Sequence, residues 1–412
     1  MQETVITLAT PIFFLLIFIE WLTGRLRGRD TYRMNDAVNS IGLGIISQVI
    51  GVFAKLLQVG LYALTVQHAA LFALPADNLL VWLFALLGYD FCYYWLHRLS
   101  HEVNILWAAH VVHHQSEAYN LSTALRQTGS GALLGWIFYL PLAVLGVPVT
   151  VFIAVALIDL LYQFWVHTQQ IGKLGWFDRV FVSPSNHRAH HGVNERYLDR
   201  NYGGILILWD RLFGTYVEED NADPVIYGTR SPLRSWNPLW ANLEVYHAMW
   251  QDAWHARNWG DKLRVWFARP GWRPADVAER YPKPDFDIAR PLFNPAVSRS
   301  TLIYCTLHFV IVLLVTTHFL AVGPKLTADV GGAYALWLIA SLWTTSGLME
   351  GKEAYRFGEA LRLVATGVMA AQMGSWFGAP IGPPVQAAIA ATCFVSLIWE
   401  WRYLPLAKTQ TA

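Results

Sequence analysis

The sequence predicts an all-α, polytopic integral membrane helical bundle with a histidine-rich di-metal site at its cytoplasmic side. Three observations support this prediction. The 412 residues are 55% hydrophobic but only 14% charged, whereas soluble domains are about 25% charged. Several apolar runs reach the about 20 residues that a membrane-spanning helix needs. Nine of the 14 histidines fall between His97 and His191. The net charge of +1 gives no indication of a nucleic-acid partner.

The apolar runs place the membrane helices in order along the chain. The first run has no basic residues before it and no small-residue cleavage site, so we expect a retained helix rather than a signal peptide. The run 131–165 contains Pro141 and Pro148, which predicts a helical hairpin or a bent helix that does not fully cross. The number of full crossings stays open. The candidate spans are 4–22, 38–66, 77–96, 131–165, 301–322, 330–348, 361–378 and 384–401.

Basic residues set the expected orientation. Arg25, Arg27, Arg29 and Arg33 follow the first span, so residues 24–36 should be cytoplasmic. Two further spans return the chain to that side near His97. We therefore expect a multi-pass protein whose active site faces the cytoplasm.

Four regions are expected. They are N-terminal membrane helices (1–76), a catalytic domain (77–220), a cytoplasmic or interfacial segment with a linker (221–298) and C-terminal membrane helices (299–412). The aromatic stretch 236–254 fits either an amphipathic helix on the headgroups or packing across the catalytic region. Residues 275–298 are rich in proline and predict an extended linker.

Eight histidines form three short clusters. The sequences are HRLSH, HVVHH and HRAHH, with spacings HxxxH, HxxHH and HxxHH. Positions i, i+3 and i+4 share one face of a helix, so each cluster directs its imidazoles the same way. His167 ends an apolar run at the same edge and is expected as a ninth ligand or as an outer hydrogen-bond donor. The cluster members are His97, His101, His110, His113, His114, His187, His190 and His191.

Eight clustered imidazoles exceed the needs of one ion, which predicts a site for two metals. The clusters lack cysteine, which disfavours iron–sulfur and copper(I) sites, and carboxylates are sparse near them. An all-imidazole site in a membrane favours two iron ions that activate O₂. Zinc remains open from spacing alone and would favour hydrolysis. A histidine-rich metal transporter is a further alternative, although transporter sites usually lie at mid-membrane and these clusters lie at span ends.

Longer motifs extend the pattern. They are YDFCYYWLHRLSHEVNILWAAHVVHHQSEAYNLSTALRQ (89–127), LLYQFWVHT (160–168), NHRAHHGVNERYLDRNYGGILILWDRLFGTY (186–216) and VIYG (225–228). Together they resemble the fatty acid hydroxylase/sterol desaturase superfamily, and most closely its alkylglycerol monooxygenase branch.

This resemblance implies a di-iron monooxygenase that uses O₂ and a tetrahydropterin as electron donor. Its substrate would be a membrane lipid, hydroxylated beside an ether oxygen and released as a fatty aldehyde and a glycerol derivative. The eight cluster histidines match the family's metal motifs one for one. The wider superfamily leaves sterol or fatty-acyl hydroxylation or desaturation as the alternative.

Several polar residues near the clusters are candidates for supporting roles. Glu102 matches a glutamate that the family carries directly after the second histidine. Each candidate has a structural alternative as a helix cap or in an ion pair. Asp159, an acid in an apolar run, remains unassigned. The catalytic candidates are Glu102, Asn120, Arg126 and Asp210, and further outer candidates are Gln127, Asn186 and Asn201.

Overall fold

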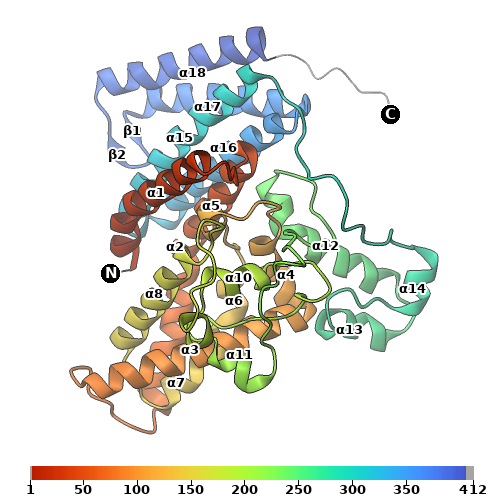
Figure 1. The fold of residues 1–412 in the computed structure, drawn as a ribbon. Coiled ribbons are helices and arrows are strands. Elements are labelled where there is room, and N and C mark those ends of the chain that lie inside the picture. Colours follow the sequence, from red (N-terminus) through yellow and green to blue (C-terminus); the bar gives the residue numbers. More distant parts are fainter. Residues whose placement is uncertain (1, 405–412) are drawn as a thin grey trace. The chain divides into compact units, whose positions relative to one another are not determined.

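The computed structural model describes residues 2–404, with the side chains of 2–7, 55 and 56 left out, and it is mostly helical, with almost no strand (Figure 1). Residues 405–412 of the expected C-terminal region lie outside the described part. The chain divides into two compact units. The first contains the residues up to Ser47, Phe53–Leu233 and Ala241–Leu292, and the second contains Gln48–Val52, Arg234–Trp240 and the chain from Phe293 onward.

The first unit holds the histidine clusters. Its helices are α1 (Gln2–Leu26), α2 (Met34–Ala69), α3 (Leu79–Glu102), α4 (Asn104–His114), α5 (Leu121–Ala124), α6 (Gly131–Gly135), η1 (Trp136–Tyr139), α7 (Leu140–Val144), α8 (Val149–Trp165), α9 (Phe177–Val180), α10 (Pro184–His190), α11 (Leu208–Phe213), α12 (Pro238–His255), α13 (Trp259–Phe267) and α14 (Ala275–Arg280). One short stretch of α2 and the start of α12 belong to the second unit.

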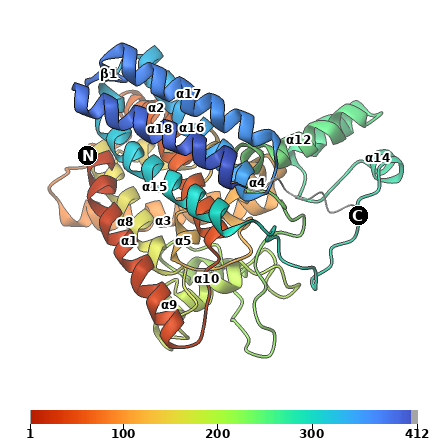
Figure 2. The same ribbon diagram turned by 90° about the horizontal axis from the view of Figure 1, so that it is seen from above.

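The second unit consists mainly of four helices, seen side by side in Figures 1 and 2. A two-residue antiparallel hairpin, which the all-α prediction did not include, pairs Ser375 with Pro380 and Trp376 with Ala379. The elements are α15 (Arg299–Val322), η2 (Gly323–Lys325), α16 (Ala328–Met349), α17 (Ala354–Met373), β1 (Ser375–Trp376), β2 (Ala379–Pro380) and α18 (Pro383–Tyr403).

Within the described residues, five helices are long and apolar enough to cross a membrane. They include Leu8–Leu26, Met34–Ala54, Leu79–Glu102, Arg299–Lys325 and Pro383–Tyr403. This confirms the expected multi-pass membrane protein. The expected spans 330–348 and 361–378 form helices but are not among the five. The reason is composition, because α16 is rich in small polar residues and α17 carries charges in its first half.

The run 131–165 is broken as its prolines predict. Pro141 lies in the first turn of α7 and Pro148 caps α8, and Gly146 makes the turn between them with φ +85°. A side chain at Gly146 would collide with the Phe72 carbonyl, 1.9 Å from an ideal Cβ. Helix α8 is too short to count among the spans. It packs on α3 and α2, where Tyr62 stacks on Phe152 at 3.9 Å between ring centroids.

The aromatic stretch 236–254 is largely α12. One face packs Met249 and Ala253 against Ala108 and Val265, while the indole rings of Trp250 and Trp254 are exposed. Packing across the catalytic region is therefore part of its role. The expected linker is not extended throughout, because ADVAER after Pro274 contains good helix formers and forms α14.

Candidate metal centre

The first two histidine clusters meet because a single residue separates their helices. Helix α3 ends at Glu102, Val103 is extended with φ −123° and ψ 122°, and α4 begins at Asn104. The change of direction brings the end of α3 beside α4. His97 and His110 thereby come within 3.1 Å, measured between their Nε2 atoms.

The third cluster lies on the short helix α10. Ser183 caps its start, where the Ser183 side chain accepts a hydrogen bond from the Asn186 amide, and Pro184 occupies the first turn. His191 is the C-terminal cap, and Gly192 follows. An ideal Cβ on Gly192 would lie 2.8 Å from Tyr197 Cβ, so the chain needs glycine at this point to leave the helix.

The nine imidazoles form two groups. Within each group, one ligand nitrogen from every residue lies within 4.8 Å of all the others. The two groups adjoin, because the rings of His114 and His191 stack at 4.3 Å between centroids. One group contains His97, His101, His110, His114 and His190, and the other contains His113, His167, His187 and His191.

The nitrogen separations suit metal ions of high coordination number. Neighbouring Nε2 atoms in both groups lie 3.0–3.2 Å apart. Ligands at about 2.1 Å from one ion are about 3.0 Å apart at octahedral angles and about 3.4 Å at tetrahedral angles. The observed spacing is therefore nearer to octahedral than to tetrahedral geometry, and six-fold coordination would leave one open position in the group of five and two in the group of four.

Main-chain carbonyls hold four of the rings. The Nδ1–H groups of His97, His113, His167 and His190 donate to the carbonyls of Tyr202, Arg126, Gln163 and Arg200 at 2.8, 2.9, 2.8 and 2.8 Å, respectively. This fixes the Nδ1–H tautomer and leaves each Nε2 with a free lone pair facing its group.

Three buried imidazole nitrogens have no hydrogen-bond partner among the described residues. They are Nδ1 of His187, in the group of four, and the Nε2 atoms of His101 and His190, both in the group of five. A buried polar atom without a hydrogen bond is costly. Coordination to a metal ion would satisfy the two Nε2 atoms, so the residues present fit the expected metal.

Burial favours the neutral form of several imidazoles in both groups. It is the largest cause that lowers the pKa of His114, His187 and His191 well below the usual range, with neighbouring imidazoles adding to the effect. It also lowers the pKa of His113 to about 4. Neutral imidazole is the form that binds metals.

A cavity of about 500 Å³ opens onto the centre. Its inner wall is formed by His101, His114, His190 and His191, with apolar surface from Trp107 and other residues of α4 and α12. Charged side chains also line the cavity, among them Arg230, Glu244, Asp252, Arg273 and Lys283. The arrangement places a pocket of ligand size against the imidazoles.

Asp210 lies behind the centre and does not line it. Its carboxylate accepts hydrogen bonds from the amides of Tyr202 and Gly203 at 2.7 and 2.8 Å and from the Thr215 hydroxyl at 2.6 Å. Because the Tyr202 carbonyl anchors His97, Asp210 acts as a positioning residue. Burial raises its pKa to about 6.

Asn201 and Asn186 fasten the same loop. Asn201 adopts φ +57° and donates to the carbonyls of Asn186 and Val217 at 3.0 and 2.8 Å. Asn186 in turn donates to the carbonyls of Asp178 and Phe181. Both side chains bond to the main chain around α10, which is a supporting role.

Arg126 touches the centre through its backbone. Its carbonyl anchors His113, while its fully buried guanidinium donates to the Val112 carbonyl at 2.6 Å and to Asn39 at 2.7 Å. Asn120 caps α5 and donates to the Thr31 carbonyl, and Gln127 donates to the Ala124 carbonyl. The side chains of these three residues thus bond away from the imidazoles.

Glu102 is placed at the edge of the cluster. It pairs with Arg98 at 3.0 Å and with Arg269 at 3.8 Å. These contacts match its structural alternative, an ion pair. Any role for Glu102 and the other outer candidates in the reaction stays a prediction.

Two further acids, Asp90 and Glu20, hold segments near the centre, and the sequence did not predict this role. The Asp90 carboxylate accepts from the amides of Ile205 and Leu206 and from the Trp209 indole at 2.7, 3.1 and 2.8 Å. Glu20 accepts from the Leu121 amide and the Thr168 hydroxyl. Their signal in the sequence was an acid inside an apolar run, the same signal that drew attention to Asp159.

The sequence around this centre is similar to that of known proteins. Residues 82–215, which contain all nine imidazoles, match the fatty acid hydroxylase family. An alkylglycerol monooxygenase of Danio rerio is 38% identical over 81% of this chain and 76% of its own length. The chain belongs to the fatty acid hydroxylase family.

Other relatives of this fatty acid hydroxylase carry the same name. The alkylglycerol monooxygenase of Xenopus tropicalis is 36% identical over 75% of this chain and 69% of its own length. The human alkylglycerol monooxygenase is 41% identical over 65% of this chain, which spans only 59% of that relative. The expected resemblance to the superfamily and to this branch is confirmed. No solved structure gives a significant match.

Proposed function

We propose that this fatty acid hydroxylase is a membrane di-iron monooxygenase that uses O₂ to cleave the ether bond of alkylglycerols, giving a fatty aldehyde and a glycerol derivative. One observation carries the proposal: nine imidazoles, eight of them buried, lie in adjoining groups of five and four beside a cavity of about 500 Å³. The substrate class comes from the relatives' names.

The proposed ligand set is the nine clustered histidines. When bound there, two iron ions would supply the oxygen-activating chemistry that carbon hydroxylation requires. The chain's own contribution is to orient Nε2 lone pairs through carbonyls that hold Nδ1–H. The buried cluster also keeps bulk water from the reacting carbon, while the cavity admits the lipid's headgroup end.

The electron donor and orientation are parts of the same proposal. A tetrahydropterin is the expected donor, and the charged residues that line the cavity offer hydrogen-bonding groups for a polar co-substrate. A cytoplasmic active site follows from the basic residues after the first span.

Metal analysis and product formation test the proposal together. The full chain, purified in detergent and loaded anaerobically with ferrous iron, should hold about two iron ions. Given O₂ and tetrahydropterin, it should convert an alkylglycerol to a fatty aldehyde, and omission of the pterin should stop turnover. Equal turnover of a free fatty acid or a sterol would instead support the alternative superfamily reactions. Hydrolysis by a zinc-loaded protein without O₂ would overturn the proposal.

A further inference from the structure

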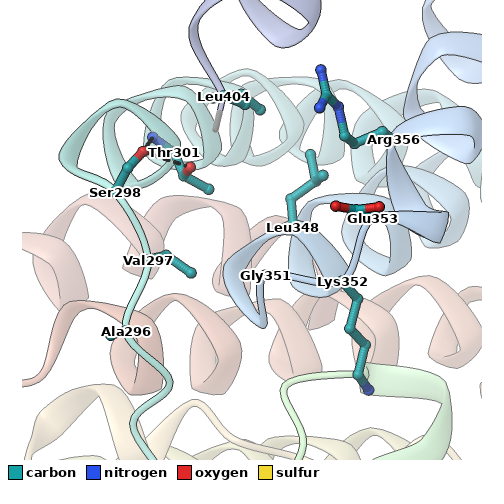
Figure 3. A pocket seen from close by; sticks show the side chains of 10 residues that line it. All are labelled: Ala296, Val297, Ser298, Thr301, Leu348, Gly351, Lys352, Glu353, Arg356 and Leu404. Atoms are coloured by element: carbon teal, nitrogen blue, oxygen red, sulfur yellow. Dashed lines mark hydrogen bonds between the residues drawn. The ribbon is translucent and has the colours of Figure 1, made fainter. Parts of the chain in front are cut away.

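The second unit contains a small polar pocket that the proposed reaction does not use. Its volume is about 110 Å³, and Figure 3 shows Ser298 and Thr301 on one side with Lys352, Glu353 and Arg356 on the other. Leu348 and Leu404 add apolar surface. The pocket has room for several water molecules, and therefore for one small polar group.

The pocket lies at one end of the four-helix unit. It is lined from the start of α15, the end of α16, the start of α17 and the residue after α18. Helices α15 and α18 are long and apolar enough to span a membrane. Where such helices end, the surroundings change from hydrocarbon to lipid headgroups. The pocket is therefore at headgroup level.

Arg356 is the residue that points to a ligand. It is 7% exposed, and its Nε is buried without a hydrogen-bond partner among the described residues. Its guanidinium donates through Nη2 to the Glu400 carbonyl at 2.8 Å, while the nearby buried Glu400 carboxylate accepts no hydrogen bond from it and leaves Nε unsatisfied. A buried guanidinium with an unused donor is costly unless an acceptor completes its hydrogen bonds. Phosphate oxygens match its planar fork.

The opposite wall adds favourable groups for an anion. Ser298 caps α15, a helix of 24 residues, and its hydroxyl lies 2.9 Å from that of Thr301. The positive end of the helix dipole favours negative charge here. This helix end alone would not define a site, but it faces the buried Arg356 across the pocket.

The acids beside the pocket limit the charge of the ligand. Lys352 pairs with Glu350, whose Oε1 is already bonded to the Ser235 hydroxyl and the Trp236 amide. Glu353 also lines the pocket, and its side chain is exposed. A nearby carboxylate disfavours a doubly charged phosphate more than a singly charged one. These charges together favour a singly charged phosphodiester over a doubly charged phosphate.

We propose that this pocket binds the phosphodiester group of an anionic membrane lipid. The lipid is favoured over free phosphate because the pocket combines headgroup depth with the apolar surface of Leu348 and Leu404. Exposed Arg299 at the same end would attract an anionic leaflet. The site is independent of the proposed reaction.

Native mass spectrometry of the full chain in detergent tests this site. Wild-type protein should retain phosphatidylglycerol in preference to diacylglycerol with the same acyl chains. Arg356→Gln should weaken phosphatidylglycerol binding about tenfold or more, since it removes a charge-assisted hydrogen bond. Arg356→Lys should recover part of the loss. Arg402→Gln, an exposed arginine outside the pocket, is the matched control and should bind as the wild type does.

The outcomes separate the possible ligands. Unchanged binding by Arg356→Gln, or an equal loss in Arg402→Gln, would overturn the pocket. Displacement of the lipid by millimolar inorganic phosphate would assign the pocket to free phosphate and overturn the lipid. If Arg356→Gln does not fold, Thr301→Val replaces it; weaker retention of phosphatidylglycerol alone would support the site, and unchanged retention would overturn it.

Discussion

The histidines differ in how their rings are held by hydrogen bonds. His97, His113, His167 and His190 each have a carbonyl partner that sets the tautomer. His190 also presents a buried Nε2 without a hydrogen bond, which a metal ion would satisfy. A change at this residue therefore tests the proposed ligand set directly.

We expect His190→Ala to lose activity and to hold less iron than the wild type. The reason is that the group of five would lose a ring oriented by the Arg200 carbonyl. Iron measured by plasma emission spectroscopy, with aldehyde formation as the second readout, checks this. His68→Ala is the control, since His68 is exposed at the end of α2. Wild-type iron content and turnover in His190→Ala would remove His190 from the ligand set.

Asp210→Asn should lower iron binding less than His190→Ala does. The amide cannot accept from all three donors that the carboxylate holds, so the Tyr202 carbonyl behind His97 should loosen. Loss of an outer support typically lowers metal affinity about 10–100-fold. The rate of iron release to a chelator measures this effect. Complete loss of activity with an unchanged release rate would indicate a direct chemical role instead.

At the scale of elements, the histidine helices could be predicted, but their supports could not. HxxxH, HxxHH and HxxHH specify residue type and helical face, and the structure places them on α3, α4 and α10 with His167 among them. The anchoring atoms of Tyr202, Arg200 and Gln163 are backbone carbonyls, which any residue supplies. No pattern of side chains could reveal them.

Gly204 shows how closely the loop after α10 approaches α3 and α8. An ideal Cβ there would lie 2.6 Å from Asp159 Oδ1 and 3.0 Å from Asp90 Oδ1. Gly204→Ala should therefore displace the loop and lower the thermal midpoint, with a cost of about 1–3 kcal/mol typical of overpacking. Fluorescence-detected thermal unfolding measures it. Gly172→Ala is the matched control, because its Cβ would meet nothing within 4 Å. An equal effect of both variants would contradict this explanation.

At the scale of the whole molecule, composition predicted a multi-pass helical protein, and five described helices meet the requirement for spans. The length of the apolar runs did not show that α16 and α17 fall short of the composition of a membrane span. Their polar residues pack inside the second unit. The buried Glu359, for example, accepts hydrogen bonds from Tyr304 and Thr344. Such internal partners are invisible in a hydropathy profile.

The buried imidazoles should make the chelated protein sensitive to acid. The pKa of His113 is about 4 in the folded chain, against about 6.5 in an unfolded chain. Below pH 6.5 the unfolded state binds more protons, so the free energy of unfolding should fall between pH 6.5 and 4, by about 3 kcal/mol for His113 alone. Thermal midpoints across this range check the sign. A midpoint that rises on acidification would contradict it.

The carbonyl anchors of the rings have an electrical consequence. Imidazoles held by neutral peptide groups bring no negative charge into the centre. Cations bound there would keep nearly their full charge in a medium of low polarity, which favours the lower oxidation state of a redox metal. The same positive field would attract small anions such as azide and cyanide to open coordination positions, where they would inhibit the enzyme.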